Sequence, residues 1–155
     1  MLAPSVDRVE RNTNPEVNAR IRRETELSIA RYRGAPAGAI RRRLDELDRE
    51  WDIERYLETM APTFSLAGLV LGLTKNRLWL LVPAVVQTFF LQHALQGWCP
   101  PVPVLRRLGV RTMDEINEER YALKALRGDF ENVDTVTGLS GDSRRVMEAM
   151  AAARS

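Results

Sequence analysis

Two side chains in this sequence are chemically distinctive because each residue type occurs only once: His93 and Cys99. Both lie at the end of a long apolar stretch. An imidazole there can relay protons, ligate a metal or hydrogen-bond a neighbouring helix. A thiol at such a boundary can carry a persulfide or form an intermolecular disulfide, and Arg106 and Arg107 are the nearest downstream bases that could activate it. The plainer interpretations are a hydrogen-bonded histidine and a small apolar residue in a proline turn, and these are favoured.

The remaining composition excludes most other chemistry. A single cysteine rules out an intramolecular disulfide and any zinc site built from several cysteines. With one histidine and one cysteine, a metal site would need carboxylates or a second protomer, and Cys99-Pro100 is only a weak signal for haem binding, so we expect no metal and no cofactor. The sequence has no glycine-rich phosphate-binding loop, no Ser/His/Asp set and no paired-carboxylate site. We therefore expect a non-enzymatic protein without catalytic residues.

The elements that must position the histidine and the cysteine are two apolar stretches in a region without acidic residues. Residues 60–98 contain no Asp or Glu, and Lys75 and Arg77 are their only bases. These two bases lie in a polar connector, residues 74–77, between the two apolar stretches. The pattern predicts an antiparallel apolar helical hairpin within an all-α fold.

The lengths of the two stretches indicate a bilayer as their partner. The first, residues 60–73, falls short of the roughly 20 residues that a bilayer requires unless its helix begins earlier, near Tyr56. Whether it crosses completely therefore stays open. The second, residues 78–98, is long enough. Trp79 and Trp98 would be anchors at its two interfaces, roughly 28 Å apart in one continuous helix, which is close to the thickness of the hydrocarbon core.

Small and polar residues at helical spacing predict how the hairpin packs. Gly68 and Gly72 form a small-xxx-small pair, which lets helix backbones approach closely. The second helix carries a stripe of small and polar side chains, formed by Ala84, Thr88, Gln92 and Gln96. This stripe can meet the glycine face or the same stripe of another protomer. We therefore expect a homo-oligomer.

The N-terminal flank, residues 1–58, is predicted to hold two charged amphipathic helices after a loose arm at residues 1–13. Asn14-Pro15-Glu16 is a typical helix start, and that helix is expected to end at Gly34. The next helix carries one apolar stripe at spacings of four, three and four, formed by Ile40, Leu44, Leu47 and Trp51. Its other faces are charged and are expected to be solvated. The stripe would pack within the protein, on a second copy or on a membrane surface.

The membrane hairpin with its Cys-Pro-Pro turn is expected to occupy residues 59–112, and the segment after Cys99 has little room for regular helix. Thr112-Met113-Asp114-Glu115 is a capping box that starts a helix in the C-terminal flank, residues 113–155. This helix is expected to end near Arg127. A linker at 129–141 and a short helix at 142–153 would follow.

The net charge, the first thirty residues and the distribution of basic residues indicate which partners and which location to expect. The net charge is +2 and both flanks are balanced, which gives little reason to expect a nucleic-acid partner. The first thirty residues lack the apolar core of a secretory signal. Bases near the hairpin are more frequent in the flanks than in the connector. By the positive-inside rule, both termini are expected in the cytoplasm.

Residues 60–112 also resemble a known family. The short apolar segment holds Gly68-Leu-Val-Leu-Gly72, and the longer one ends in Gly97-Trp98-Cys99-Pro100-Pro101. Leu108-Gly109-Val110-Arg111-Thr112 follows. This pattern resembles the YgaP-like inner-membrane domain family of bacteria. The resemblance implies two membrane helices, self-association through the hairpin, location in the bacterial inner membrane, and interest in Cys99 as a candidate reactive thiol.

The resemblance does not carry an activity to this chain. Some family members are fused to a rhodanese domain, which carries sulfur as a persulfide, but this chain lacks that domain and its catalytic cysteine loop. The long charged N-terminal helices and the extended C-terminus also depart from the family. They suggest a cytoplasmic surface for a protein partner that the sequence does not identify.

Three functions follow as hypotheses. The leading one is a non-enzymatic inner-membrane protein that anchors or scaffolds and self-associates. The first alternative is a thiol-dependent accessory protein in sulfur or redox handling that uses Cys99. The second alternative is a soluble helical protein whose hairpin is buried against a partner. The pathway, the partner and the number of protomers are not predicted.

Overall fold

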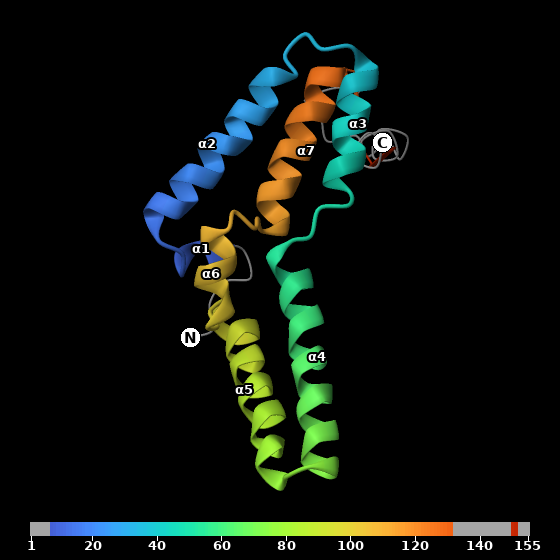
Figure 1. The fold of residues 1–155 in the computed structure, drawn as a ribbon. Helices are drawn as coiled ribbons and strands as arrows, with labels where there is room; N and C mark the ends of the chain where they lie inside the picture. The colour runs from blue at the N-terminus through green and yellow to red at the C-terminus, as the bar shows by residue number, and fades with distance from the viewer. Residues whose placement is uncertain (1–6, 132–149, 152–155) are drawn as a thin grey trace, which may run out of the picture. The chain divides into compact units, whose positions relative to one another are not determined.

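The computed structural model describes residues 7–131 and 150–151, and the regular secondary structure in these residues is all helical (Figure 1). The all-α fold with an apolar helical hairpin is therefore confirmed. The helices are α1 (Arg8–Arg11), α2 (Pro15–Arg31), α3 (Ala37–Leu47), α4 (Ile53–Thr74), the 3₁₀ helix η1 (Arg77–Leu80), α5 (Leu81–Gln96), α6 (Pro101–Arg107) and α7 (Met113–Arg127).

The chain forms two compact units that are not consecutive in sequence. The first comprises Met1–Arg22 and Trp51–Met113, and the second comprises Arg23–Glu50 and Asp114–Ser155. Residues 7–22 thus group with the hairpin, although they precede the helices of the second unit in the sequence.

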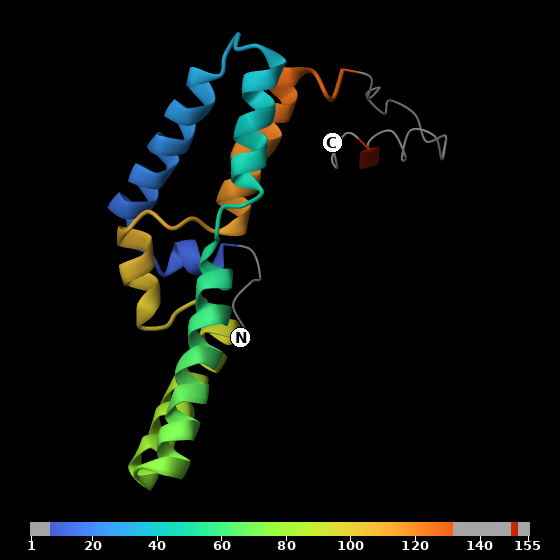
Figure 2. The ribbon, with the colours of Figure 1, turned by 45° about the vertical axis from the view of Figure 1, so that its right-hand side comes forward.

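Helices α4 and α5 lie side by side and run in opposite directions, as Figures 1 and 2 both show. Helix α4 begins at Ile53 because the Asp52 carboxylate accepts a hydrogen bond from the Arg55 backbone N–H at 2.8 Å. Its 22 residues correspond to roughly 33 Å at 1.5 Å per residue. The first apolar stretch thus gains its length from the residues before Met60.

The second arm of the hairpin starts as a 3₁₀ helix and ends earlier than expected. It begins with η1 and continues as α5, which ends where Gly97 adopts a left-handed conformation with φ 75°. The Gly97 N–H donates to the His93 carbonyl oxygen at 2.7 Å. Trp98 therefore lies beyond the helix and Trp79 lies in η1. The expectation of one continuous helix between the two tryptophans, ended by Cys99-Pro100-Pro101, is wrong.

Two segments that were expected to be irregular contain helices. Arg8–Arg11 forms α1, so the loose arm does not extend through residue 13. Pro101–Arg107 forms α6, against the expectation that the segment after Cys99 has little room for helix. Pro100 is the N-cap of α6 and Pro101 is its first residue, a position where a missing N–H has no intrahelical partner to lose.

The first unit has a hydrophobic core at the end of the hairpin that lies away from η1. Its buried members come from α1, the start of α4, the turn after α5, and α6: Val9, Ile53, Leu57, Cys99, Val102 and Leu105. The Ile53 N–H, which has no partner within α4, donates to the Arg111 carbonyl oxygen at 3.0 Å. Helices α1 and α6 therefore close this end of the hairpin.

The second unit has a core formed by α3 and α7. Ile40, Leu44 and Leu47 of the predicted stripe pack with Ile116 and Leu123. The fourth member of the predicted stripe, Trp51, does not join them. It lies in the first unit, 39% exposed, with its ring 5.3 Å from that of Tyr56 and 4.5 Å from the Arg55 guanidinium.

An ionic cluster beside this second core contradicts the expectation of simply solvated charged faces. The Glu119 side chain is fully buried, and its carboxylate accepts hydrogen bonds from Arg43 Nε at 2.9 Å and from the Ser28 hydroxyl at 2.6 Å. The hydrogen bond to Glu119 raises the pKa of Arg43 above its ordinary value. Of the predicted linker and last helix, all but residues 129–131 and 150–151 lie outside the described residues.

Candidate functional site

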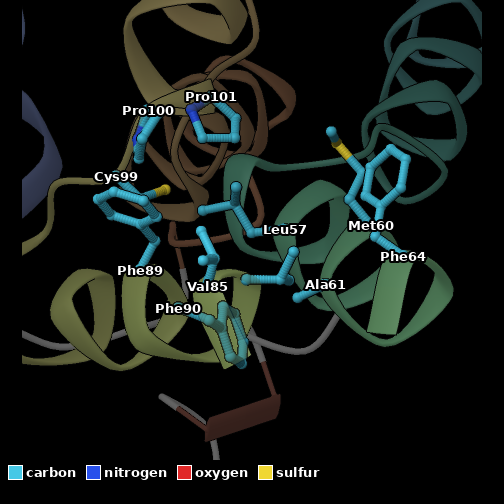
Figure 3. A pocket seen from close by; sticks show the side chains of 11 residues that line it. Leu57, Met60, Ala61, Phe64, Val85, Phe89, Phe90, Cys99, Pro100 and Pro101 are labelled. Carbon is cyan, nitrogen blue, oxygen red and sulfur yellow. The ribbon is translucent and has the colours of Figure 1, made fainter. Parts of the chain in front are cut away.

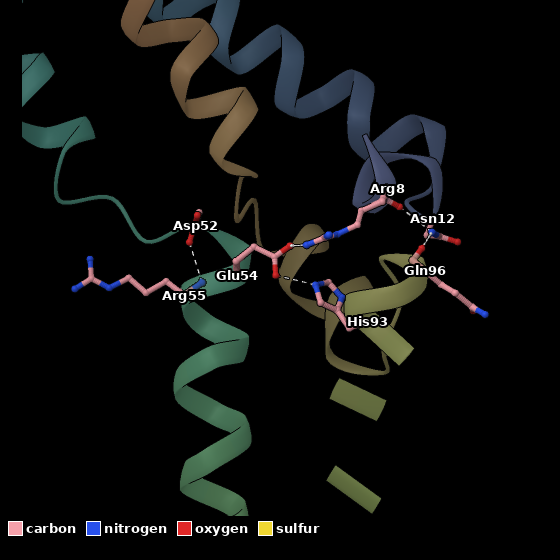
Figure 4. A network of polar contacts seen from close by, with 7 residues as sticks. All are labelled: Arg8, Asn12, Asp52, Glu54, Arg55, His93 and Gln96. Atoms are coloured by element: carbon pink, nitrogen blue, oxygen red, sulfur yellow. Dashed lines mark hydrogen bonds and ion pairs between the residues drawn. The ribbon is translucent and has the colours of Figure 1, made fainter. Parts of the chain in front are cut away.

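The closed end of the hairpin holds a polar cluster around His93 (Figure 4). The His93 ring is 1% exposed, and its Nε2 lies 2.9 Å from Oε2 of Glu54. The other carboxylate oxygen of Glu54 accepts a hydrogen bond from Arg8 Nη2 at 2.9 Å. Glu54 thus bridges a buried imidazole and a guanidinium, which comes from α1.

The hydrogen bond to Glu54 determines which ring nitrogen of His93 is available. A carboxylate paired with a guanidinium is ionised and only accepts hydrogen bonds, so His93 Nε2 carries the hydrogen. In the neutral ring Nδ1 then has the lone pair, and within the described residues it makes no hydrogen bond. Cys99 lies close enough to this ring to interact with it electrostatically. A carboxylate, an imidazole and a thiol therefore lie near one another at this end of the hairpin.

Close packing at Gly97 keeps α1 in position for this cluster. A Cβ atom at Gly97 would lie 2.5 Å from the backbone carbonyl carbon and oxygen of Arg8. The Asn12 side chain donates hydrogen bonds to the Arg8 and Gln96 carbonyl oxygens, each at 2.8 Å. The guanidinium of Arg8 therefore reaches Glu54 from a backbone that rests directly on the end of α5.

Cys99 is 3% exposed and forms part of the wall of an apolar cavity of about 280 Å³ (Figure 3). The cavity lies between α4, α5 and the start of α6. Its lining residues are Leu57, Met60, Ala61, Phe64, Val85, Val86, Phe89, Phe90, Cys99, Pro100 and Pro101. Figure 3 shows the Cys99 sulfur directed toward Leu57, inside the ring of these side chains.

The two bases predicted to activate Cys99 lie in the last turn of α6, and Arg107 is exposed. The Arg106 side chain is fully buried and donates to the Val110 carbonyl oxygen at 3.1 Å and to Asn18 Oδ1 at 2.8 Å. The hydrogen bond between Arg106 and Asn18 links α6 to the first part of α2. No group of three or more possible metal ligands of the types His, Cys, Asp and Glu occurs among residues 7–131 and 150–151.

The predicted packing glycines lie against the other arm of the hairpin. A Cβ atom at Gly68 would meet Pro83 Cδ at 2.7 Å, and one at Gly72 would meet the Leu80 side chain at 2.5 Å. Pro83 lies in the first turn of α5, where its ring contacts α4 instead of breaking a helix interior. The glycine face thus contacts η1 and the first turn of α5.

The predicted small and polar stripe lies on the outside of α5. Ala84 and Thr88 are exposed, and the Thr88 hydroxyl donates to the Ala84 carbonyl oxygen at 2.8 Å. Gln92 is half-buried and Gln96 is exposed. The predicted interface anchor Trp79 is also exposed, whereas Trp98 is half-buried. The stripe is therefore available to lipid or to a second protomer.

Sequence reasoning missed Glu54, Arg8 and the cavity. Glu54 lies 39 residues before His93, and no local periodicity links the two. One signal was available in retrospect, because a lone histidine at the end of an apolar helix needs a polar partner from the opposite arm of the hairpin. The nearest acids on that arm are Glu54 and Glu58.

Comparison with family models, with curated proteins and with solved structures returned no match for this chain. The likeness to the YgaP-like family stays a prediction.

Proposed function

We propose that this chain is an integral protein of the bacterial inner membrane, in which the α4–α5 hairpin anchors helices that serve as a cytoplasmic scaffold. One observation carries the proposal: α4 and the η1–α5 arm are long and apolar enough to cross a membrane, and their apolar side chains are largely exposed. Only 28% and 6% of the residues in their apolar windows are buried within the protein. The core helices of a soluble protein would be mostly buried.

The exposed side chains are large and contiguous along both arms. They include Phe64, Leu66, Leu69, Val70, Leu73, Leu78, Leu81, Val85, Phe89, Leu91 and Leu95. Apolar surface of this extent marks a membrane or a protein interface. The α4–α5 connection with its Lys75 and Arg77 would lie on the far side of the bilayer, and both termini would lie in the cytoplasm. Self-association stays a prediction, with the half-buried Gln92 amide as the polar group that a second protomer would satisfy in lipid.

Labelling of single cysteines tests this topology. In a Cys99→Ser background, Lys75→Cys lies in the exposed connection and Arg41→Cys lies on the exposed face of α3. A membrane-impermeant maleimide added to spheroplasts is expected to label the first variant at once and the second only after permeabilisation. Equal labelling of both positions before permeabilisation, or labelling of neither, would contradict a crossing hairpin.

Thiol chemistry at Cys99 is a second candidate function, which the neighbouring His93–Glu54 pair supports. The chain has one cysteine, so a disulfide would have to form with another molecule. Burial of the thiol opposes this step, because a second protein's sulfur must approach to bonding distance. The cavity is the available route to the sulfur, so an apolar reagent fits the site better than a polar oxidant.

A further inference from the structure

Helix α6 has an exposed apolar face in addition to the face that it buries. Val102 and Leu105 are buried in the core of the first unit. Val104 is 57% exposed, and Leu108, the C-cap residue that keeps right-handed helical backbone angles, is 75% exposed. Side chains four residues apart lie on the same side of a helix. Val104 and Leu108 therefore form one apolar face that points away from the core.

This face of α6 is continuous with the exposed apolar surface of the hairpin. Pro101 lies three residues before Val104, on the same side of α6, and lines the cavity between α4 and α5. Phe64 and Val85, which line the same cavity, are 51% and 52% exposed. An exposed apolar residue that stands singly needs no explanation, but an apolar surface that extends over three helices marks a membrane or a protein interface.

The end of the hairpin that carries α6 has the residues typical of a membrane–water interface. Trp51 precedes α4, with the Arg55 guanidinium 4.5 Å from the centre of its ring, and Trp98 follows α5. Tryptophan side chains are enriched at the level of the lipid headgroups. The polar cluster around His93 lies at this same end, and charged groups are tolerated there because water and headgroups solvate them. The residues beside α6 thus indicate the depth of one bilayer surface.

The charge of the α6 segment also favours a lipid surface as its partner. Residues 99–113 contain no Asp or Glu. Two of their three arginines, Arg106 and Arg111, are buried, and the third, Arg107, is exposed next to Leu108. An exposed helix surface that combines apolar and basic side chains without acids is typical of a helix that lies in the headgroup region of an anionic bilayer.

We propose that α6 lies in the plane of the bilayer surface, with Val104 and Leu108 among the upper parts of the lipid chains and Arg107 at the headgroup phosphates. This inference rests on the proposed membrane insertion and adds a second contact with the leaflet that α5 leaves. The proline turn at Pro100-Pro101 makes this contact, because it ends the crossing segment and begins α6. An in-plane helix fixes the depth and the rotation of the hairpin, and so keeps the polar cluster around His93 at the surface.

Spin labels on single cysteines test the proposal in vesicles of phosphatidylcholine and phosphatidylglycerol. In a Cys99→Ser background, Val104→Cys and Leu108→Cys carry the label on the apolar face, and Arg107→Cys carries it on the adjacent basic side. The first two labels are expected to collide with oxygen and to be shielded from a water-soluble nickel chelate, at a depth of about 5–10 Å in the boundary between headgroups and acyl chains. The label of Arg107→Cys, the matched control, is expected to be reached by the chelate.

The accessibility of the labels separates the outcomes. If the chelate reaches Val104→Cys and Leu108→Cys as readily as Arg107→Cys, α6 lies in water and the proposal fails. If both labels are shielded from oxygen as well as from the chelate, a protein covers this face, and the proposal also fails. Leu91→Cys, at an exposed position of α5, reports on the hairpin itself. If its label is shielded from the chelate and the α6 labels are not, membrane insertion stands and only the place of α6 is wrong. If the chelate reaches Leu91→Cys too, the proposed insertion fails.

Photo-crosslinking of the unaltered protein avoids any folding defect of a variant. A phosphatidylglycerol with a diazirine near the glycerol end of one acyl chain is expected to label residues 101–108 after irradiation of the vesicles. The same lipid with the diazirine at the far end of the chain is expected to label the middle of the hairpin and to leave residues 101–108 unlabelled. If both lipids label the hairpin and neither labels residues 101–108, the proposal is overturned and membrane insertion stands.

Discussion

Replacing Gly97 by alanine is expected to lower the free energy of unfolding of the first unit by about 2–5 kcal/mol, the sum of a left-handed backbone penalty and an overpacking penalty. Gly97 has a φ of 75°, and a Cβ atom there would lie 2.5 Å from backbone atoms of Arg8. These are backbone atoms, so no side-chain rotation relieves the contact. Helix α1 must move away from the end of α5, and the Arg8–Glu54 ion pair should be lost with it.

Gly109→Ala is the matched control for this variant. Gly109 also has a positive φ, 88°, but a Cβ atom there would have no neighbour within 4 Å. It is expected to lose only about 1–2 kcal/mol, the backbone penalty alone. All three tryptophans lie in the first unit, so their fluorescence during denaturant unfolding in micelles reports on this unit. Equal losses in the two variants would show that α1 does not pack tightly against Gly97.

Replacing Arg43 by methionine is expected to destabilise the second unit by about 3 kcal/mol, the low end of the cost of breaking a buried ion pair. Glu119 is fully buried and receives two hydrogen bonds from Arg43, at 2.9 and 3.2 Å. The low end applies because Arg43 is 22% exposed. Methionine keeps the apolar stem but leaves the buried carboxylate without its guanidinium. The raised pKa of Arg43 means that its charge, and the stability it provides, persists through the whole neutral range and is lost only in strong alkali.

Two further variants complete the test of the ion pair. Arg42→Met changes an exposed neighbour and is expected to alter stability by less than about 0.5 kcal/mol. Arg43→Met combined with Glu119→Leu is expected to recover part of the loss, because the buried carboxylate that lost its guanidinium is then also removed. Hydrogen exchange of the α3 and α7 amides measures the effect within the second unit. If the Arg43→Met protein is as stable as the Arg42→Met protein, the Arg43–Glu119 ion pair does not stabilise the second unit.

The parts of the fold that were predictable are those with a local pattern. Residues 60–98 contain no acidic residue, and this length of apolar sequence is typical of a pair of apolar helices. Ile40, Leu44 and Leu47 repeat at helical spacing. Helices α1 and α6 were missed because each is too short for a periodic pattern to emerge. Their stability comes from Val9, Val102 and Leu105 in the core, which is tertiary packing rather than helix propensity.

Only part of the candidate site was predictable from the sequence. His93 and Cys99 were conspicuous because each is unique, but their partners lie far away in the sequence. Glu54 looks like an ordinary first-turn acid of α4 until the antiparallel arm brings His93 to 2.9 Å from it. Trp51 shows the opposite failure, because its spacing continues the α3 stripe although the helix ends at Leu47.

Resistance to alkaline carbonate extraction tests the central claim, that the hairpin inserts into the bilayer. The full-length protein is expected to stay in the membrane pellet. Leu66→Arg combined with Leu91→Arg, at two exposed positions of the hairpin, is expected to shift it to the supernatant, since an arginine costs up to about 2.5–3.5 kcal/mol in a bilayer, the value at the helix centre. Leu27→Arg, at an equally exposed position of α2, is expected to leave it in the pellet. Release of the unaltered protein into the supernatant would contradict the account, because the exposed apolar hairpin would then be covered by another protein.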